Sequence, residues 1–149
     1  TGVTIINDPS TLDDSIVLSH GDALCTDDSA YQEMRKVLRG EVWQNETLSK
    51  SLAERQMFGK ALRAESIANN TNKSSAIMDV NADAVTDLIG ANIKTFIHGH
   101  THRPGIHQVA QRKAKRIVLG DWGPCGWLCR QDDDTISLEC FNLVHRYEI

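Results

Sequence analysis

Apolar and polar residues follow two different spacings along this chain. Short apolar runs at 3–6, 14–20 and 94–98 are bounded by polar or turn-forming residues, and each predicts a strand. Further strands are expected in the last third, over 106–111, 116–119, 127–130 and 135–141. The strands are therefore predicted to lie at the start and at the end of the chain.

Helical spacing dominates the middle of the sequence. Polar capping residues at 26–28 precede apolar residues at three- and four-residue intervals over 30–38, which predicts a helix that stops at Gly40. The stretch 46–68 predicts two helices with a break near Gly59.

One more helix is expected just before the strand at 94–98. Asp79 or Asn81 can cap it, apolar residues follow at helical spacing, and Gly90 ends it. With the strands on either side of the helices, the chain is predicted to belong to the α/β class, with antiparallel β structure at its end.

Length and composition fit one soluble domain. The 149 residues can bury a sizeable core, and 40% hydrophobic with 24% charged content is ordinary for a globular protein. No apolar run approaches a membrane span and no amino-terminal signal pattern is present, so a cytoplasmic location is expected. The chain begins Thr-Gly-Val-Thr without an initiator Met, which leaves room for an upstream segment.

Charge is unevenly distributed. The net charge of −4 gives no reason to expect a nucleic-acid partner, yet 35–73 carries 8 Lys and Arg against 4 Glu. A second basic run at 112–116 is most simply a solvated hairpin turn. The four cysteines are too sparse for a disulfide scaffold and lack zinc-finger spacing, so reduced thiols are expected.

Histidines at alternate positions carry the first candidate chemistry. His98, His100 and His102 end the predicted strand at 94–98, and in an extended segment alternate residues face one way. The apolar strand at 14–20 also ends in His-Gly, which places His20 at a second strand end. Imidazole ligates zinc, manganese, iron and nickel, so a metal site is predicted outside these strand ends. The alternative for His100 and His102 is a hydrogen-bonded structural pair, and for His98 a supporting role is preferred.

The order and spacing of these motifs resemble a known family. His-Gly-Asp at 20–22, followed by Gly-His-Thr-His at 99–102, resembles the last two motifs of the calcineurin-like metallophosphoesterases. The match is closer to the branch that acts on UDP-2,3-diacylglucosamine, and it is carried by the stretches 20–28, 73–81, 97–104 and 118–122.

This resemblance implies a fold, an activity and partners. The expected fold is the carboxyl-terminal part of a metallophosphoesterase β-sandwich flanked by helices, one partial domain over 1–149 with a helical lid insertion at about 41–75. The implied reaction cleaves the pyrophosphate bond of UDP-2,3-diacylglucosamine to UMP and 2,3-diacylglucosamine 1-phosphate in lipid A biosynthesis. Two Mn²⁺ ions would activate hydroxide to attack the α-phosphorus. The protein would be peripheral on the cytoplasmic face of the inner membrane, with the membrane surface as its partner.

The resemblance also assigns residues. By motif position the metal ligands are His20, His100 and His102, with His100 also catalytic and close to the substrate phosphate. The substrate contacts it implies are Asp28, Tyr31, Arg63, Ser66, Asn70 and Lys73. From the residues alone, Asp28 is interpreted as an acid in a first helical turn and Tyr31 as a core aromatic, so their functional role rests on the resemblance.

The chain departs from the family pattern in one respect. The family's earlier motifs, Asp-x-His, Gly-Asp and Gly-Asn-His/Arg-Asp, carry further metal ligands and do not occur before His20. Three imidazoles without those carboxylates are expected to hold metal loosely, so the chain alone is expected to be inactive. The alternatives are a metallophosphoesterase acting on another phosphodiester or nucleotide, and a non-catalytic metal-binding or membrane-surface module.

Overall fold

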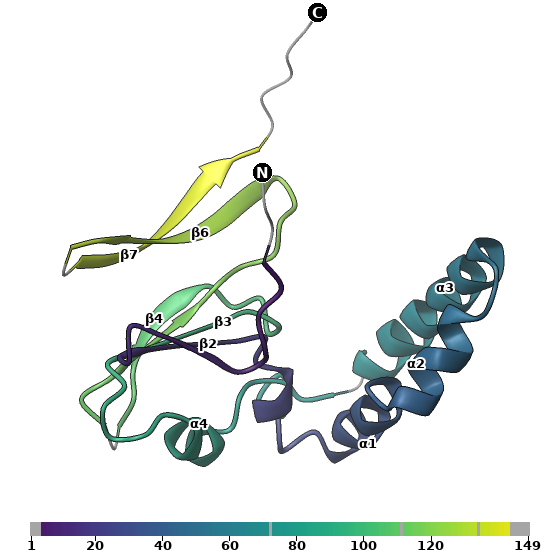
Figure 1. Ribbon diagram of the computed structural model, residues 1–149, viewed down its shortest axis with the longest axis horizontal. Helices are drawn as coiled ribbons and strands as arrows, with labels where there is room; N and C mark the ends of the chain where they lie inside the picture. Colours follow the sequence, from purple (N-terminus) through teal and green to yellow (C-terminus); the bar gives the residue numbers. More distant parts are fainter. Residues whose placement is uncertain (1–3, 72, 111, 134, 144–149) are drawn as a thin grey trace, which may run out of the picture. The chain divides into compact units, whose positions relative to one another are not determined.

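The computed structural model describes residues 4–71, 73–110, 112–133 and 135–143 (Figure 1). Within it the chain divides into two compact units. Unit 1 combines the first 24 residues with those from Val80 onward, and unit 2 is Cys25–Asp79. Each unit has its own elements and internal contacts.

A five-stranded mixed sheet forms the centre of unit 1, with the order β1-β2-β3-β5-β4 (Figure 1). The three central strands are parallel, whereas β1 and β4 pair antiparallel at the two edges. The strand bounds are Ser10–Leu12 for β1, Ile16–Ser19 for β2, Thr95–His98 for β3, Gly105–Gln108 for β4 and Lys115–Val118 for β5.

Strand register assigns residues to the two faces of this sheet. Val17 pairs with Phe96, and helix α4 (Ala82–Leu88) packs on their face through Val85 and the following Ile89. Phe96 and Ile89 are fully buried there, so this layer is the hydrophobic core of unit 1.

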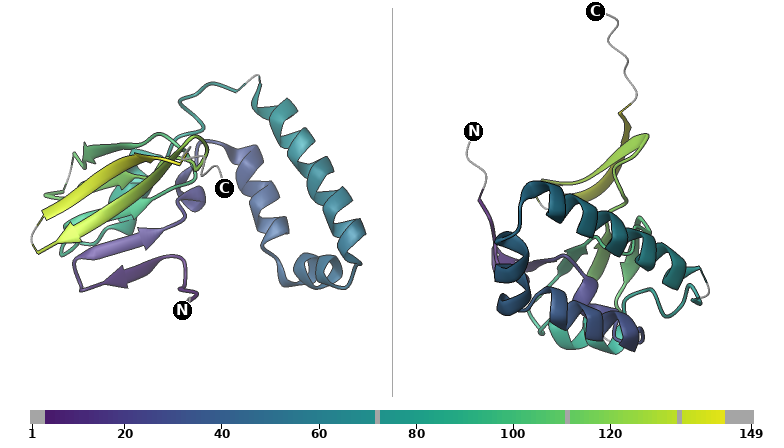
Figure 2. Two further views of the ribbon diagram at one scale, coloured as in Figure 1. Left: turned by 90° about the horizontal axis from the view of Figure 1, so that it is seen from above. Right: turned by 90° about the vertical axis from the view of Figure 1, so that its right-hand side faces the viewer.

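A separate hairpin lies on the side of the sheet opposite α4 (Figures 1 and 2). It consists of β6 (Cys125–Asp132) and β7 (Thr135–Asn142), paired antiparallel. Gly120 and Trp127 pack tightly, because a Cβ at Gly120 would lie 2.4 Å from the indole nitrogen of Trp127. The Trp122 indole N–H donates to the backbone carbonyl of Trp127 at 3.1 Å.

Unit 2 contains three helices, α1 (Ser29–Leu38), α2 (Glu41–Leu48) and α3 (Leu52–Asn70). Figure 2 shows α3 running back roughly antiparallel to α1. A capping box begins α3: Ser51 Oγ accepts from the Glu54 backbone N–H, and the Glu54 carboxylate accepts from the Ser51 backbone. The Ser51 hydroxyl also donates to this carboxylate, and these hydrogen bonds lower the pKa of Glu54.

Several predicted elements are confirmed. The helix expected at 30–38 is α1, and Asn81 rather than Asp79 caps α4 by accepting from two backbone N–H groups. The strands expected from 94 onward correspond to β3 through β7, with ends displaced by a few residues. The fold is thus mixed α/β and compatible with part of a metallophosphoesterase; the complete β-sandwich and the lid role stay predictions.

Other expectations are wrong. Residues 4–6 form no strand, since the first strand is Ser10–Leu12, and residues 1–3 lie outside the described part. Gly59 does not break a helix but lies inside α3, because one helical glycine costs only about 1 kcal/mol relative to alanine. The break falls at 49–51 instead, where Ser51 provides the capping box.

None of the helices in the described ranges combines the length and the apolar character that crossing a bilayer requires.

Candidate functional site

Two parallel strands deliver the histidines to one edge of the unit 1 sheet. Ser19 at the end of β2 is paired with His98 at the end of β3. The chain therefore continues from both strands at the same edge, with His20 following β2 and residues 99–103 following β3. Carboxyl ends of adjacent parallel strands are a common position for ligand sites.

His20 lies beside a buried carboxylate. Its Nδ1 lies 3.2 Å from Oδ1 of Asp22, and the His20 side chain is 51% exposed while that of Asp22 is 2% exposed. This contact does not have the geometry of a hydrogen bond, so it fixes neither the tautomer nor the orientation of the imidazole. About half of the His20 side chain therefore faces solvent beside a buried carboxylate.

His20 and His100 come together, with ring centroids 5.0 Å apart and the planes inclined at 57°. The expectation of three rings on one face of an extended segment is wrong, because His100 and His102 have left-handed φ values of 60° and 51°. The chain turns tightly here, and the Thr101 N–H donates to the Gly99 carbonyl at 2.7 Å. Left-handed conformations are uncommon for residues other than glycine and cluster at functional sites. The structure brings His20 and His100 together and leaves His102 exposed.

His98 plays a supporting part. It is fully buried and stacks on Phe96 with centroids 4.9 Å apart. Arg116 can only donate, so its Nη1, 3.1 Å from Nε2 of His98, makes Nε2 an acceptor. Nδ1 then carries the hydrogen and donates to the Gly99 carbonyl at 3.0 Å. Both ring nitrogens are used within the protein, as the supporting role requires.

Gly21 closes the gap between the two strand ends. Its φ of +99° is a conformation that side chains rarely adopt, and an added Cβ would lie 2.8 Å from Nδ1 of His98. Glycine at this position therefore allows the loop that carries His20 to pass directly against the buried imidazole.

The donors present fit part of a metal centre. His20 and His100 offer nitrogen ligands, and Oγ1 of Thr101 in the same loop is buried with no hydrogen-bond partner in the described part of the chain. However, no three His, Cys, Asp or Glu side chains among the described residues are grouped to hold a metal ion. The described residues therefore do not complete a two-metal centre.

Unit 2 places two of the predicted substrate contacts against each other. Lys73 Nζ lies 2.6 Å and 2.9 Å from the two carboxylate oxygens of Asp28, and their side chains are 19% and 8% exposed. Asp28 is also the N-cap of α1, accepting from the Tyr31 backbone N–H at 3.1 Å. The ion pair joins the start of α1 to the segment after α3.

Of the remaining predicted contacts, Tyr31 lies on α1 and is half-buried, and the other three lie on α3. Arg63 is exposed, Ser66 is half-buried one turn later, and Asn70 is the last helical residue, with a side chain outside the described part. Arg63 and Ser66 are three positions apart and so lie on neighbouring positions of the helix surface.

Sequence reasoning missed two residues that support the histidines. Asp8 accepts from the Ser19 hydroxyl at 2.7 Å and from the His20 backbone N–H at 3.2 Å. Arg116 holds His98 from β5. No local signal marks Arg116, since its role depends on the pairing of β3 with β5. Asp22, in contrast, was visible in His-Gly-Asp as a carboxylate two residues from His20.

Comparison with known proteins gives a consistent result. No family model matches the chain. It is 40% identical to a UDP-2,3-diacylglucosamine hydrolase of Pseudomonas fluorescens over 96% of its own length and 60% of the relative. Relatives of the same name from Hahella chejuensis and Bordetella pertussis are 42% and 46% identical, over 92% and 87% of this chain.

The chain is a relative of the UDP-2,3-diacylglucosamine hydrolases. It spans about 60% of the length of the curated relatives it matches, 59% for that of Hahella chejuensis and 53% for that of Bordetella pertussis. The aligned part includes nearly all of this chain, so both units belong to the region shared with those hydrolases.

Replacing Gly21 with alanine should destabilise unit 1. The Gly21→Ala variant must relieve both a left-handed backbone and a contact with His98, at a cost of about 1–3 kcal/mol in the free energy of unfolding. Urea denaturation measures this cost. Gly90→Ala is the matched control, because a Cβ there meets nothing within 4 Å. Equal midpoints for the two variants would contradict the proposed close packing of Gly21 on His98.

Breaking the Asp28–Lys73 pair should destabilise unit 2. Asp28→Asn keeps an oxygen for the helix cap and removes the charge, and Lys73→Met removes the cation; each should cost up to about 3–5 kcal/mol. The double variant should lose less than the sum of the two, which a double-mutant cycle detects.

The exposed Lys36–Glu33 pair provides a control for this cycle, since Lys36→Met should cost below about 1 kcal/mol. Strict additivity of the Asp28 and Lys73 substitutions would mean that the two side chains do not interact in solution.

Proposed function

We propose that this protein hydrolyses the pyrophosphate bond of UDP-2,3-diacylglucosamine, releasing UMP and 2,3-diacylglucosamine 1-phosphate in lipid A biosynthesis. The observation that carries the proposal is the relationship to hydrolases of that name, at 37–46% identity over 87–97% of the chain. The pairing of His20 with His100 at adjacent strand ends supports it. The chain spans about 60% of the length of those relatives. The complete activity is therefore proposed for this chain joined to the part of the relatives that it does not cover.

In this proposal, the residues of unit 1 bind the metal and contact the reacting phosphate. His20, His100 and His102 are the proposed metal ligands, with the buried carboxylate of Asp22 in contact with His20. Manganese is the proposed ion; when bound, it would neutralise charge on the phosphoryl oxygens. His100 is proposed to contact the substrate phosphate as well, since its imidazole lies beside that of His20.

The residues of unit 2 are proposed to bind the substrate. Arg63 and Lys73 provide cations suited to a diphosphate, and Asp28 holds the Lys73 ammonium in place. Tyr31, Ser66 and Asn70 are the proposed polar contacts to the sugar. Large apolar side chains of α2 and α3 are exposed to solvent and are proposed to meet acyl chains: Val42, Leu48, Leu52, Met57, Phe58 and Ile67.

The same helices support a membrane-surface location. Exposed apolar residues next to the basic charge of 35–73 are typical of segments that lie on anionic lipid. We propose that the protein is cytoplasmic and binds peripherally to the inner face of the inner membrane. A role of 41–75 as a lid over the acyl chains belongs to this proposal.

Activity should appear when the chain is joined to the portion of the Pseudomonas fluorescens relative that the alignment leaves uncovered. The joined protein should release UMP from UDP-2,3-diacylglucosamine with added Mn²⁺, and the 149-residue chain alone should not. His100→Ala should lower kcat/KM by about 10²-fold or more, as measured by chromatography of UMP.

His107→Ala, on β4, is the control and should retain turnover. Unchanged turnover in His100→Ala would refute the site assignment. Cleavage of a soluble phosphodiester without cleavage of the acylated substrate would favour a different metallophosphoesterase. No cleavage of either would favour a non-catalytic module.

The apolar residues of α3 should contribute to vesicle binding. Replacing Leu52 and Met57 with Gln should weaken binding to phosphatidylglycerol vesicles by roughly tenfold or more, because each exposed side chain loses its burial in lipid. Co-sedimentation measures this, and high salt should weaken binding further. Ile5→Gln with Ile106→Gln, both exposed in unit 1, is the matched control. Equal losses in both pairs would argue against a specific role for α3.

A further inference from the structure

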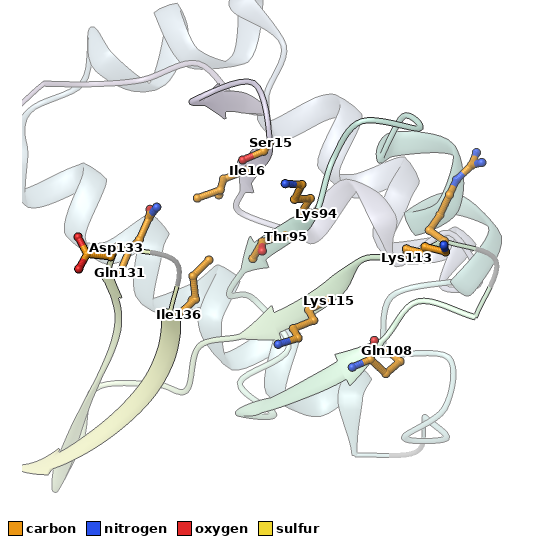
Figure 3. Close-up of a pocket in the computed structure, with 11 residues that line it drawn as sticks. Ser15, Ile16, Lys94, Thr95, Gln108, Lys113, Lys115, Gln131, Asp133 and Ile136 are labelled. Carbon is orange, nitrogen blue, oxygen red and sulfur yellow. The ribbon is translucent and has the colours of Figure 1, made fainter.

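A cavity in unit 1 lies away from the His20–His100 site. It has a volume of about 610 Å³, within the range of small-ligand sites. Figure 3 shows hairpin residues on one side, Lys113 and Gln108 on the other, and Lys94, Thr95 and Lys115 between them. The cavity lies where β2 and β3 begin, whereas His20 and His98 lie where those strands end. Three residues of strand, roughly 10 Å, separate the two edges.

Strand pairing gives this cavity a fixed floor. Ile16 pairs with Thr95, Thr95 with Lys115, and Lys115 with Gln108, so these four residues lie in one row across four strands on one face. Backbone hydrogen bonds tie the strand starts together: Lys94 N to the Ser15 carbonyl at 2.8 Å, and Lys115 N to the Lys94 carbonyl at 2.9 Å. Ile16 and Thr95 are buried, so the base of the cavity is preformed.

Positive charge is concentrated around this floor. Among the described residues, the cavity is lined by Lys94, Arg112, Lys113 and Lys115, and Asp133 is the one acidic side chain. Within the described part of the chain, none of these four cations forms an ion pair with an acidic side chain. They are gathered at one place in a chain whose net charge is −4. A bound anion would be attracted by several of these cations at once.

The remaining lining residues suit an oxygen-rich ligand. Ser15 and Thr95 carry hydroxyl donors, Gln108 and Gln131 carry amide donors, and lysine and arginine supply charge-assisted hydrogen bonds. The basic run at 112–116 is therefore more than a solvated turn: Arg112, Lys113 and Lys115 border the cavity, while Arg116 points to the other face and holds His98.

We propose that this cavity is an accessory binding site for a phosphate-bearing anion, either a free phosphomonoester or the head group of an anionic phospholipid. The site is separate from the histidines, and it stands whether or not the hydrolase activity proposed above is confirmed. Lys94 and Lys115 provide its central charges, and Arg112 and Lys113 provide the charge at its rim.

Inorganic phosphate is the first probe. Its binding to the 149-residue chain is monitored by ¹⁵N NMR at constant ionic strength. Phosphate should shift the backbone amides of Thr95 and Lys115 in a saturable way, and chloride should not. Lys94→Gln with Lys115→Gln should weaken phosphate binding at least about tenfold, through loss of two charge-assisted contacts. A second variant, Arg112→Gln with Lys113→Gln, changes two residues of the turn. It leaves the residues at the starts of the strands unchanged.

Lys36→Gln with Lys50→Gln is the matched control, because it changes the net charge equally but lies in unit 2. Phosphate binding kept by this control and lost in both cavity variants supports the site. Shifts that are not saturable, that chloride reproduces, or that persist in the cavity variants would overturn it.

Two further probes distinguish the source of the phosphate. UMP is titrated as a free phosphomonoester, and phosphatidylglycerol vesicles are compared with phosphatidylcholine vesicles by co-sedimentation. A loss of phosphatidylglycerol binding in Lys94→Gln with Lys115→Gln identifies a lipid head group as the ligand. A loss of UMP binding alone identifies a free phosphomonoester. If neither ligand binds more weakly to this variant, the proposal fails.

Discussion

The parallel pairing of β2 with β3 is the constraint on which the candidate site depends. It sets Ser19 opposite His98, so the two His-Gly segments leave the sheet side by side although about eighty residues separate them in sequence. The crossover between these strands contains α4, whose apolar side chains cover Val17 and Phe96. Burial of that layer stabilises the register, because a shift by one residue would turn Phe96 and His98 to the opposite face.

The same pairing gives the sheet two chemically different edges. At the ends of the parallel strands, imidazoles and a buried carboxylate meet in tight loops. At their starts, lysines surround a floor of paired backbone. Unit 2 is organised differently: short caps and the Asp28–Lys73 ion pair hold helices whose apolar side chains stay exposed. Helices with such an exposed apolar surface are stabilised by the partner surface that covers them rather than by a hydrophobic core of their own.

Local signals made much of this fold predictable. Caps such as Asp28 and Asn81, and apolar runs such as that before His98, act within a few residues, and they appear in the structure where they were expected. The helix break was misplaced because glycine suggested a stop at 59, whereas a serine capping box decided it at 51. Non-local effects were not predictable: the contact of Arg116 with His98 and the cavity at the strand starts both require the strand order. The alternating histidines suggested an extended segment, yet their spacing carries no information about a left-handed backbone.

That backbone limits which sequences the histidine loop can carry. At φ values of 60° and 51°, positions 100 and 102 tolerate Gly, Asn and Asp at little conformational cost, whereas β-branched residues would force the loop to rebuild. The backbone conformation alone therefore limits positions 100 and 102 to a few residue types. Asp and Asn side chains can also ligate a divalent cation. Replacing a histidine of this loop with either one would change the donor atom from nitrogen to oxygen and preserve the backbone conformation. The backbone at these two positions thus restricts the shape of the side chain more than its chemistry.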